Sequence, residues 1–339
     1  MKIGISFDLK SDAPPAPHLP DDFQEEFDSP VTVEAISAML RGLGHVVVQL
    51  GDGPALLRRL LDEPPDFVFN IAEGHGVSRS REARVPAVLE MLGIPYSGSD
   101  PLTLAVTLDK ECARRLVASA GVPVPRGAVW TPGEDPHTFV RRSSVGFPAI
   151  VKPAWEGSSK GIRGRCVVDT AEEASEALER LGRDQRQPVL LEEFVAGEEL
   201  TVGIVGNDPP QVVGILRVVP RQLNERFIYS LEVKRDWENR VTYECPPHLP
   251  VERLRSIEDA ALKVYRALGC RDVSRVDFRL RDGVPYFLEV NPLPGLNPES
   301  SDLVILAQKS GWSYGQLIEA ILTSALTRQS RIIGTPAPR

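Results

Sequence analysis

The sequence predicts an α/β protein with more than one domain. Short apolar strands alternate with amphipathic helices through the first third of the chain, and this order changes after Gly121. The chain has 339 residues, of which 42% are hydrophobic and 25% charged, so it can form two or three domains with separate cores.

The N-terminal part begins with a strand in which Ile3, Ile5 and Phe7 form the buried face. Ser29 is a favourable N-cap and Pro30 suits the first position of the helix that follows. Further along we expect a strand over 46–50, a helix over 55–61, a strand over 67–71 and a helix over 81–92. This β-α-β-α-β-α order predicts a parallel sheet covered by helices.

The rest of the chain continues with helices and strands in a less regular order. We expect one long helix over 102–120, which Gly121 ends. Strands are expected over 149–153, 166–168, 189–194, 201–205 and 212–219, with two more around Asp277 and Glu289. Helices are expected over 171–181, 251–268 and 313–322.

The overall charge and the cysteines limit the kinds of partner. The net charge of −8 argues against nucleic acid or an anionic membrane as the main partner. The four cysteines are scattered and include no C-x-x-C pair, so neither a zinc site nor a disulfide framework is expected. No stretch has the ~20 apolar residues of a membrane span, and we expect a cytoplasmic protein. Exposed apolar helices could support a homodimer.

The strongest chemical signal is a hairpin near the C-terminus. Two short strands around Asp277 and Glu289 are joined by a turn at Asp282-Gly283. Glu289 and Asn291 are two residues apart, so they share a face that can converge with Asp277. Three oxygen ligands of this kind suit Mg²⁺. The alternative is a solvated face of an antiparallel hairpin.

A second signal is a strand lysine followed by a loop of small residues. Lys152 ends an apolar strand, and the Gly/Ser-rich stretch over 156–161 follows it. Small residues allow the backbone to approach a ligand closely, and hydroxyl and amide groups can bind phosphate oxygens. A flexible turn would look the same, although the preceding lysine makes the phosphate interpretation more specific.

A third signal is an apolar strand that runs into acidic residues over 191–200. Carboxylates such as Glu192 can accept hydrogen bonds from an adenine amino group or from ribose hydroxyls, while backbone groups fix the edge of the ring. An acidic strand end that faces water is the alternative, and for this segment alone it is favoured.

In this order and spacing, the three segments resemble the ATP-grasp superfamily and, within it, the D-alanine–D-alanine ligase family. Segments 93–99, 107–110, 120–125 and 291–296 are also similar to the family, so the resemblance covers about residues 71 to 322. It implies three α/β domains with ATP bound between the central and C-terminal ones. We expect these domains at 1–105, 106–188 and 189–328, with a loose tail over 329–339.

The resemblance also implies roles for individual residues. ATP would be bound by Lys110, Lys152, Ser158, Ser159, Glu192, Glu193, Phe194, Val195, Glu199 and Lys234. Mg²⁺, with Mn²⁺ as an alternative, would be held by Asp277, Glu289 and Asn291. Arg275, Lys234 and Ser158 would act in catalysis, with Arg275 stabilising charge on the reacting carboxylate.

The amino-acid pockets depart from the family pattern. The family's N-terminal signature, whose glutamate holds the first substrate's ammonium group, is missing. The nearest acidic residues are Glu26 and Asp28, of which we carry over Asp28. The other candidates for contact with amino-acid-like substrates are Glu73, His75, Arg235, Ser300 and Ser301. For Glu73 a solvated loop carboxylate is an equal alternative.

The function that follows is an ADP-forming carboxylate–amine ligase that forms a dipeptide through an acyl phosphate. The first alternative is a ligase of the same chemistry that joins other amino acids, hydroxy acids or metabolite amines. The second is an ATP-binding protein without catalysis, which the presence of every expected phosphate and metal residue disfavours.

Overall fold

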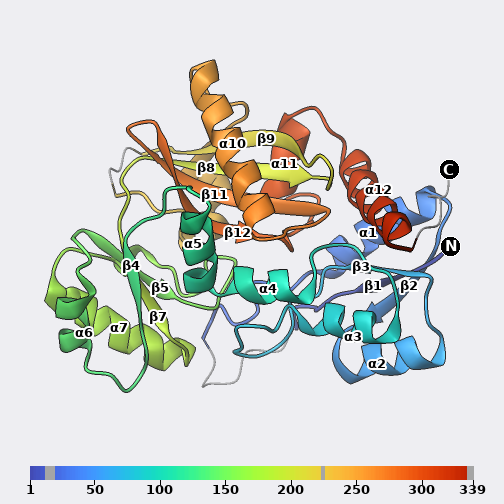
Figure 1. The fold of residues 1–339 in the computed structure, drawn as a ribbon, viewed down its shortest axis with the longest axis horizontal. Coiled ribbons are helices and arrows are strands. Elements are labelled where there is room, and N and C mark those ends of the chain that lie inside the picture. Colours follow the sequence, from blue (N-terminus) through green and yellow to red (C-terminus); the bar gives the residue numbers. More distant parts are fainter. Residues whose placement is uncertain (12–19, 223–225, 334–339) are drawn as a thin grey trace.

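A computed structural model describes residues 1–11, 20–222 and 226–333 of the chain, and it contains three sheets with their covering helices (Figure 1). The N-terminal sheet, the central sheet and the C-terminal sheet follow one another along the sequence. Most of the proline-rich segment after Lys10 lies outside the described residues. In the described part, no helix combines the length and apolar character that a membrane crossing requires.

The N-terminal unit is the predicted parallel sheet, with strand order β2-β1-β3. Its elements are β1 (Lys2–Ser6), α1 (Pro30–Gly42), β2 (Val46–Gly51), α2 (Gly53–Asp62), β3 (Phe67–Asn70) and α3 (Arg84–Leu92). Ser29 caps α1 as predicted, because its hydroxyl accepts a hydrogen bond from the Thr32 N–H. The unit therefore folds as local sequence signals indicate.

The prediction of one long helix over 102–120 is wrong, because the chain forms two helices there. These are α4 (Pro101–Leu108) and α5 (Lys110–Ser119). Asp109 separates them: its backbone is extended, and its carboxylate accepts hydrogen bonds from the first N–H groups of α5. The break places Lys110 at the start of α5, beside the Glu156 carbonyl that its Nζ contacts.

The central unit carries a four-stranded antiparallel sheet with strand order β4-β7-β5-β6. Its elements are β4 (Gly127–Trp130), α6 (Pro136–Ser143), β5 (Ala149–Pro153), β6 (Val167–Val168), α7 (Ala171–Gln185) and β7 (Val189–Glu193). We expected residue 189 to open the C-terminal domain, but β7 is hydrogen-bonded between β4 and β5. The central sheet therefore extends to Glu193.

The C-terminal unit is built on a five-stranded antiparallel sheet with strand order β10-β9-β8-β11-β12. Its strands are β8 (Glu198–Val205), β9 (Gln211–Pro220), β10 (Val241–Glu244), β11 (Val273–Arg281) and β12 (Val284–Asn291). Its helices are α8 (Leu231–Arg235), α9 (Trp237–Arg240), α10 (Val251–Ala267), α11 (Asp302–Lys309) and α12 (Tyr314–Ile333). Helix α5, expected in the central domain, shares a core with α10 through Ala113 and Val117.

The last helix is longer than predicted and joins two units. We expected a helix over 313–322 and a loose tail from residue 329, but α12 continues to Ile333. Leu317 of α12 lies in the same core as Ile3 and Ile5 of β1, and α12 packs beside α1 (Figure 1). Arg328 donates to the fully buried carboxylate of Asp272 at 2.7 Å. The expected tail over 334–339 lies outside the described residues.

We predict that Arg328→Ala destabilises the protein by about 3 kcal/mol, because it leaves the Asp272 carboxylate buried without its cation. Thermal unfolding measures the effect, and Thr323→Ala, at an exposed position of the same helix, is the matched control. An unchanged melting temperature for Arg328→Ala would contradict the docking of this end of α12.

Candidate active site

Two adjoining cavities lie where the three units meet. The first has a volume of about 70 Å³ and the second about 80 Å³. The first cavity is lined by Glu26, Glu73, Glu82, Thr107, Leu108, Lys110, Glu156, Gly157, Ser158, Arg275 and residues 289–295. The second is lined mainly by residues of β5, β7, β8, β11 and β12, with Tyr229 and Lys234. Glu289 lines both, so the two cavities meet at this carboxylate.

The predicted metal ligands form an array on one face of the β11–β12 hairpin. Asp277 pairs directly with Glu289, and Arg275 pairs with Asn291. Residues two apart on one strand share a face, and so do cross-strand partners, so all four side chains project together. A bulge between Asp277 and Phe278 shifts the register just before this array. Without the shift, Glu289 would face away from Asp277.

Glu289 is the charge centre of the array. Lys110 Nζ lies 3.6 Å from its carboxylate. Burial would raise the pKa of Glu289, but the positive charges around it, Lys110 foremost and then Lys234 and Lys152, lower that pKa to about 2. The carboxylate is therefore ionised at neutral pH, as a metal ligand must be.

Arg275 is buried against two carboxylates. Its guanidinium lies 2.9 Å from Asp277 and 3.2 Å from Asp302. The Asp277 carboxylate also accepts a hydrogen bond from the Thr201 hydroxyl on the neighbouring strand β8, at 2.8 Å. A buried guanidinium fixed in this way provides planar N–H donors that suit a carboxylate or an oxyanion.

The second cavity collects most of the residues predicted to bind ATP. Those lining it are Lys152, Ser159, Glu192, Glu193, Phe194, Val195, Glu199 and Lys234. Lys152 on β5 forms a buried ion pair with Glu192 on β7, with 2.9 Å between Nζ and Oε1. The remaining two predicted residues, Lys110 and Ser158, line the first cavity. The cavity thus combines a strand edge with positive charge, as a nucleotide requires.

The loop after β5 passes between the two cavities. Ser158 lines the first cavity and Ser159 the second. Both serines have left-handed backbones, with φ values of 49° and 60°. Such a conformation costs a non-glycine residue roughly 1–2 kcal/mol and is often found at functional sites. The Ser159 hydroxyl donates to the Tyr229 carbonyl at 3.2 Å, which holds the loop against the C-terminal unit.

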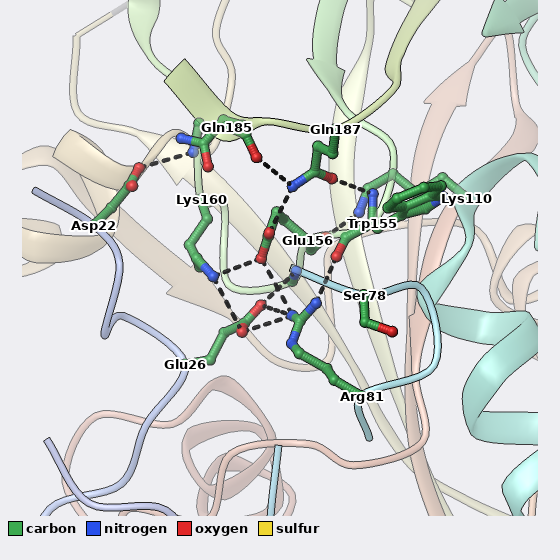
Figure 2. A network of polar contacts seen from close by, with 12 residues as sticks. Asp22, Glu26, Ser78, Arg81, Lys110, Trp155, Glu156, Lys160, Gln185 and Gln187 are labelled. Atoms are coloured by element: carbon green, nitrogen blue, oxygen red, sulfur yellow. Dashed lines mark hydrogen bonds and ion pairs between the residues drawn. The ribbon is translucent and has the colours of Figure 1, made fainter. Parts of the chain in front are cut away.

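A buried ionic network joins this loop to the N-terminal unit (Figure 2). Arg81 donates to both oxygens of Glu26 at 2.7 Å and contacts Glu156 at 3.2 Å. Lys160 contacts the same two carboxylates, and the Gly157 N–H donates to Glu26. Sequence reasoning missed this network, because only Glu156 and Lys160 share a segment, whereas Glu26 and Arg81 are far from it in the chain.

Two further carboxyls of the first cavity, Glu73 and Glu82, have no hydrogen-bond or ion-pair partner among the residues that the structure describes. Burial, followed by repulsion from Glu82 and Glu26, raises the pKa of Glu73 well above its ordinary value. Burial likewise raises the pKa of Glu82, to about 7, although Arg81 opposes the change. Both groups therefore tend to keep their protons when the cavity holds no cation.

Of the predicted substrate residues, only Glu73 lines either cavity. Arg235 is paired with Glu25 at 2.7 Å. The Nε2 atom of His75 lies 3.0 Å from Asp52. Asp28 pairs through its main chain with Asp8 and Lys10, and Ser300 and Ser301 bond to Asn297 at the start of α11. In the N-terminal segment it is Glu26, not Asp28, that reaches the first cavity.

Strands of the central and C-terminal sheets line a site with lysines, a carboxylate array and a buried arginine, an arrangement that matches the ATP-grasp class of ATP-dependent ligases. Solved structures of such ligases share this fold over nearly the whole chain. A D-alanine–D-alanine ligase of Bacillus anthracis, solved in complex with ATP, superposes with a TM-score of 0.75 at 25% identity, covering 98% of this chain and 99% of that one. The VanG D-Ala:D-Ser ligase of Enterococcus faecalis shares the fold, with a TM-score of 0.72 at 21% identity, covering 96% and 99%.

Sequence comparisons narrow the class to a family. The family model of the D-ala D-ala ligase C-terminus matches residues 116–323. The D-alanine–D-alanine ligase of Aquifex aeolicus is 35% identical over 301 residues, which cover 86% of this chain and 94% of that protein. This chain therefore belongs to the D-alanine–D-alanine ligase family. The expected fold and the ADP-forming ligase chemistry are confirmed.

We predict that Glu82→Gln makes the stability of the protein less dependent on pH. Because the pKa of Glu82 is raised to about 7, the folded state retains a proton that the unfolded state releases, so stability falls as pH rises between about 4.5 and 7. The glutamine variant lacks this loss and should be more stable than the wild type at pH 8 by on the order of 2 kcal/mol.

Thermal unfolding at pH 5 and pH 8 measures this difference, with the buffers as the only change. Glu63→Gln is the matched control, since the Glu63 side chain is 82% exposed. Identical pH profiles for Glu82→Gln and the wild type would contradict the prediction.

Proposed function

We propose that this enzyme joins the carboxylate of one small amino acid to the amine of a second, with ATP in the second cavity and the first substrate in the first cavity. The observation that carries the proposal is the position of Glu289, which lines both cavities. A phosphoryl group must pass from the nucleotide to the substrate carboxylate across this junction. The negative charge on its oxygens requires positive groups in both cavities.

The residues at the junction fit a divalent cation. Asp277, Glu289 and Asn291 offer oxygen donors from one face of a hairpin, and Glu289 is ionised there. They would hold Mg²⁺, or Mn²⁺ in its place, which when bound neutralises charge on the phosphate oxygens. The neighbouring Lys110, Lys152 and Lys234, whose charges all act on Glu289, would bind the phosphates themselves.

The second cavity suits the base and ribose of the nucleotide. Phe194 and Val195 supply apolar surface at the end of β7, and Glu193 lies alongside them. Glu199 forms an ion pair with Arg279 at 2.9 Å, which fixes its carboxylate where it could accept from ribose hydroxyls.

In the first cavity, Arg275 would hold the carboxylate of the first substrate. Bound ATP supplies the phosphoryl group that converts this poor electrophile into an acyl phosphate with a good leaving group. Arg275 would then stabilise the oxyanion that forms when the amine of the second substrate attacks. Glu73 and Glu82, which line the same cavity, could supply negative charge for the first substrate's ammonium group.

The loop after β5 and the segment around Glu26 would keep water from the acyl phosphate. Ser158 faces the first cavity, and the N–H groups of Gly157 and Gly161 are bonded to Glu26 and Asp22. The N-terminal unit thus holds the loop over the site. D-alanine, on which the relatives are named to act, is the first substrate to try. The altered amino-acid pockets lead us to expect another partner in at least one of the two positions.

We predict ADP release from Mg²⁺-ATP only in the presence of a suitable pair of amino acids. The measurement offers single and paired D- and L-amino acids, D-alanine included, and hydroxy acids, with products identified by mass. Matched formation of ADP and a condensed product supports the proposal. Release of ADP at the same rate without any amino or hydroxy acid would contradict it.

We also predict that Arg275→Lys lowers kcat about 100-fold and changes the KM for ATP little. Lysine keeps the charge that Asp277 and Asp302 require but loses the planar pair of donors. Steady-state kinetics with the best substrate pair tests this, and Arg255→Ala, at an exposed position of α10, is the control. Wild-type turnover by Arg275→Lys would remove Arg275 from the proposed mechanism.

A further inference from the structure

Glu82 is the least explained charged residue of the first cavity. The residue is only 7% exposed, and it lines the cavity. Its carboxyl has no hydrogen-bond or ion-pair partner among the described residues. Glu73, which is half-buried, lines the same cavity and likewise has no such partner among the described residues. Unpaired buried carboxyls are costly, and natural proteins seldom retain them without a reason.

The cations near these two carboxyls are already paired with other groups. Arg81 and Lys160 are bonded to Glu26 and Glu156 (Figure 2). Lys110 lies 3.6 Å from Glu289 and contacts the Glu156 carbonyl. Arg275 is held by Asp277 and Asp302. Glu73 and Glu82 are therefore the two carboxyls of the cavity for which the described residues supply no contacting cation.

A ligand with one ammonium group would balance only one of these two carboxyls. The other would have to remain protonated or carry an uncompensated buried charge. A ligand with two ammonium groups would allow both to ionise and would replace two protonated acids by two charge-assisted hydrogen-bonded pairs. Such a ligand still needs a carboxylate, because Arg275 and Lys110 line the same cavity.

We propose that the first substrate is a short diamino monocarboxylic acid, whose two ammonium groups pair with Glu73 and Glu82 while its carboxylate faces Arg275. Glu73, Glu82 and Arg275 line one cavity, so a short side chain suffices to reach all three. That this ligand is a substrate rests on the proposed function. Its binding to Glu73 and Glu82 does not, and a binding measurement alone can test it.

The test compares two ligands of nearly equal size, 2,4-diaminobutyrate and homoserine, which differ in an ammonium group against a hydroxyl. Isothermal titration of the full-length enzyme with each D- and L-form gives the affinity at neutral pH. We expect at least one enantiomer of 2,4-diaminobutyrate to bind about tenfold or more tightly than homoserine, as suits a desolvated ion pair. ADP release and product mass with the same ligands provide the second readout.

The carboxyls are tested with isosteric variants. Glu82→Gln and Glu73→Gln should each reduce the preference for 2,4-diaminobutyrate by about tenfold, while the affinity for homoserine changes less. Glu63→Gln, far more exposed, removes the same charge elsewhere and should leave the preference intact. Thermal unfolding of each variant verifies that it is folded.

The outcomes separate this inference from the proposed function. Equal affinity for the two ligands overturns the inference, even if other amino acids support ADP release and the ligase function stands. A preference for 2,4-diaminobutyrate that Glu82→Gln does not reduce also overturns it, because Glu82 would not be the recognising group. A preference that depends on Glu82, without ADP release for any pair, supports the recognition and overturns the proposed function.

Discussion

The structure depends on the pairing of charges that are buried where its three units meet. A buried ion costs several kcal/mol unless an opposite charge and hydrogen bonds compensate it, so each charged side chain at this junction constrains the position of another. Glu26 of the N-terminal segment holds Arg81 and the backbone of the loop after β5. Lys110, at the start of α5, reaches both this loop and Glu289. The units are thus positioned by their charges as well as by their apolar cores.

This pairing also explains why binding and closure belong together here. The loop that separates the two cavities is fixed on one side by Glu26 and on the other by the carbonyl of Tyr229. Its serines keep unfavourable backbone angles, which persist only because the surrounding contacts determine them. A ligand that competed for Arg81 or Lys160 would weaken the hold on this loop, because these cations bind the Glu26 carboxylate that accepts from the Gly157 N–H.

The sequence predicted the fold class and the parallel N-terminal sheet, because local patterns of apolar residues and helix caps determine both. The residues proposed to bind ATP follow from the family resemblance, and the structure brings eight of the ten to the second cavity. The cap at Ser29 and the strand lysine Lys152 are examples that a short window suffices to recognise. It did not predict the break at Asp109, where a side-chain cap outweighs the helical propensity of the residues on both sides. Nor could it place Glu26 beside Glu156, since only the folded chain brings these residues together.

The substrate positions were the least predictable for the same reason. Asp28 and Glu26 are two residues apart and chemically equivalent in a sequence, yet only Glu26 reaches the cavity. Arg235 was expected to face the substrates, but nearby acidic residues of the N-terminal segment compete for its charge. Pockets that recognise a small ligand are assembled from several units, so a motif in one unit cannot define them.

The bulge in the β11–β12 hairpin has a consequence for how this site could change. The turn at Asp282-Gly283 alone would align Asp277 with Leu288, and the bulge moves the alignment to Glu289. The proposed metal site therefore depends on the number of residues between Asp277 and Glu289 as much as on the identity of its ligands. A homologue that gained or lost one residue between Asp277 and Glu289 could keep every ligand and still lose the site. Only a matching gain or loss of a bulge would restore the pairing of these two residues.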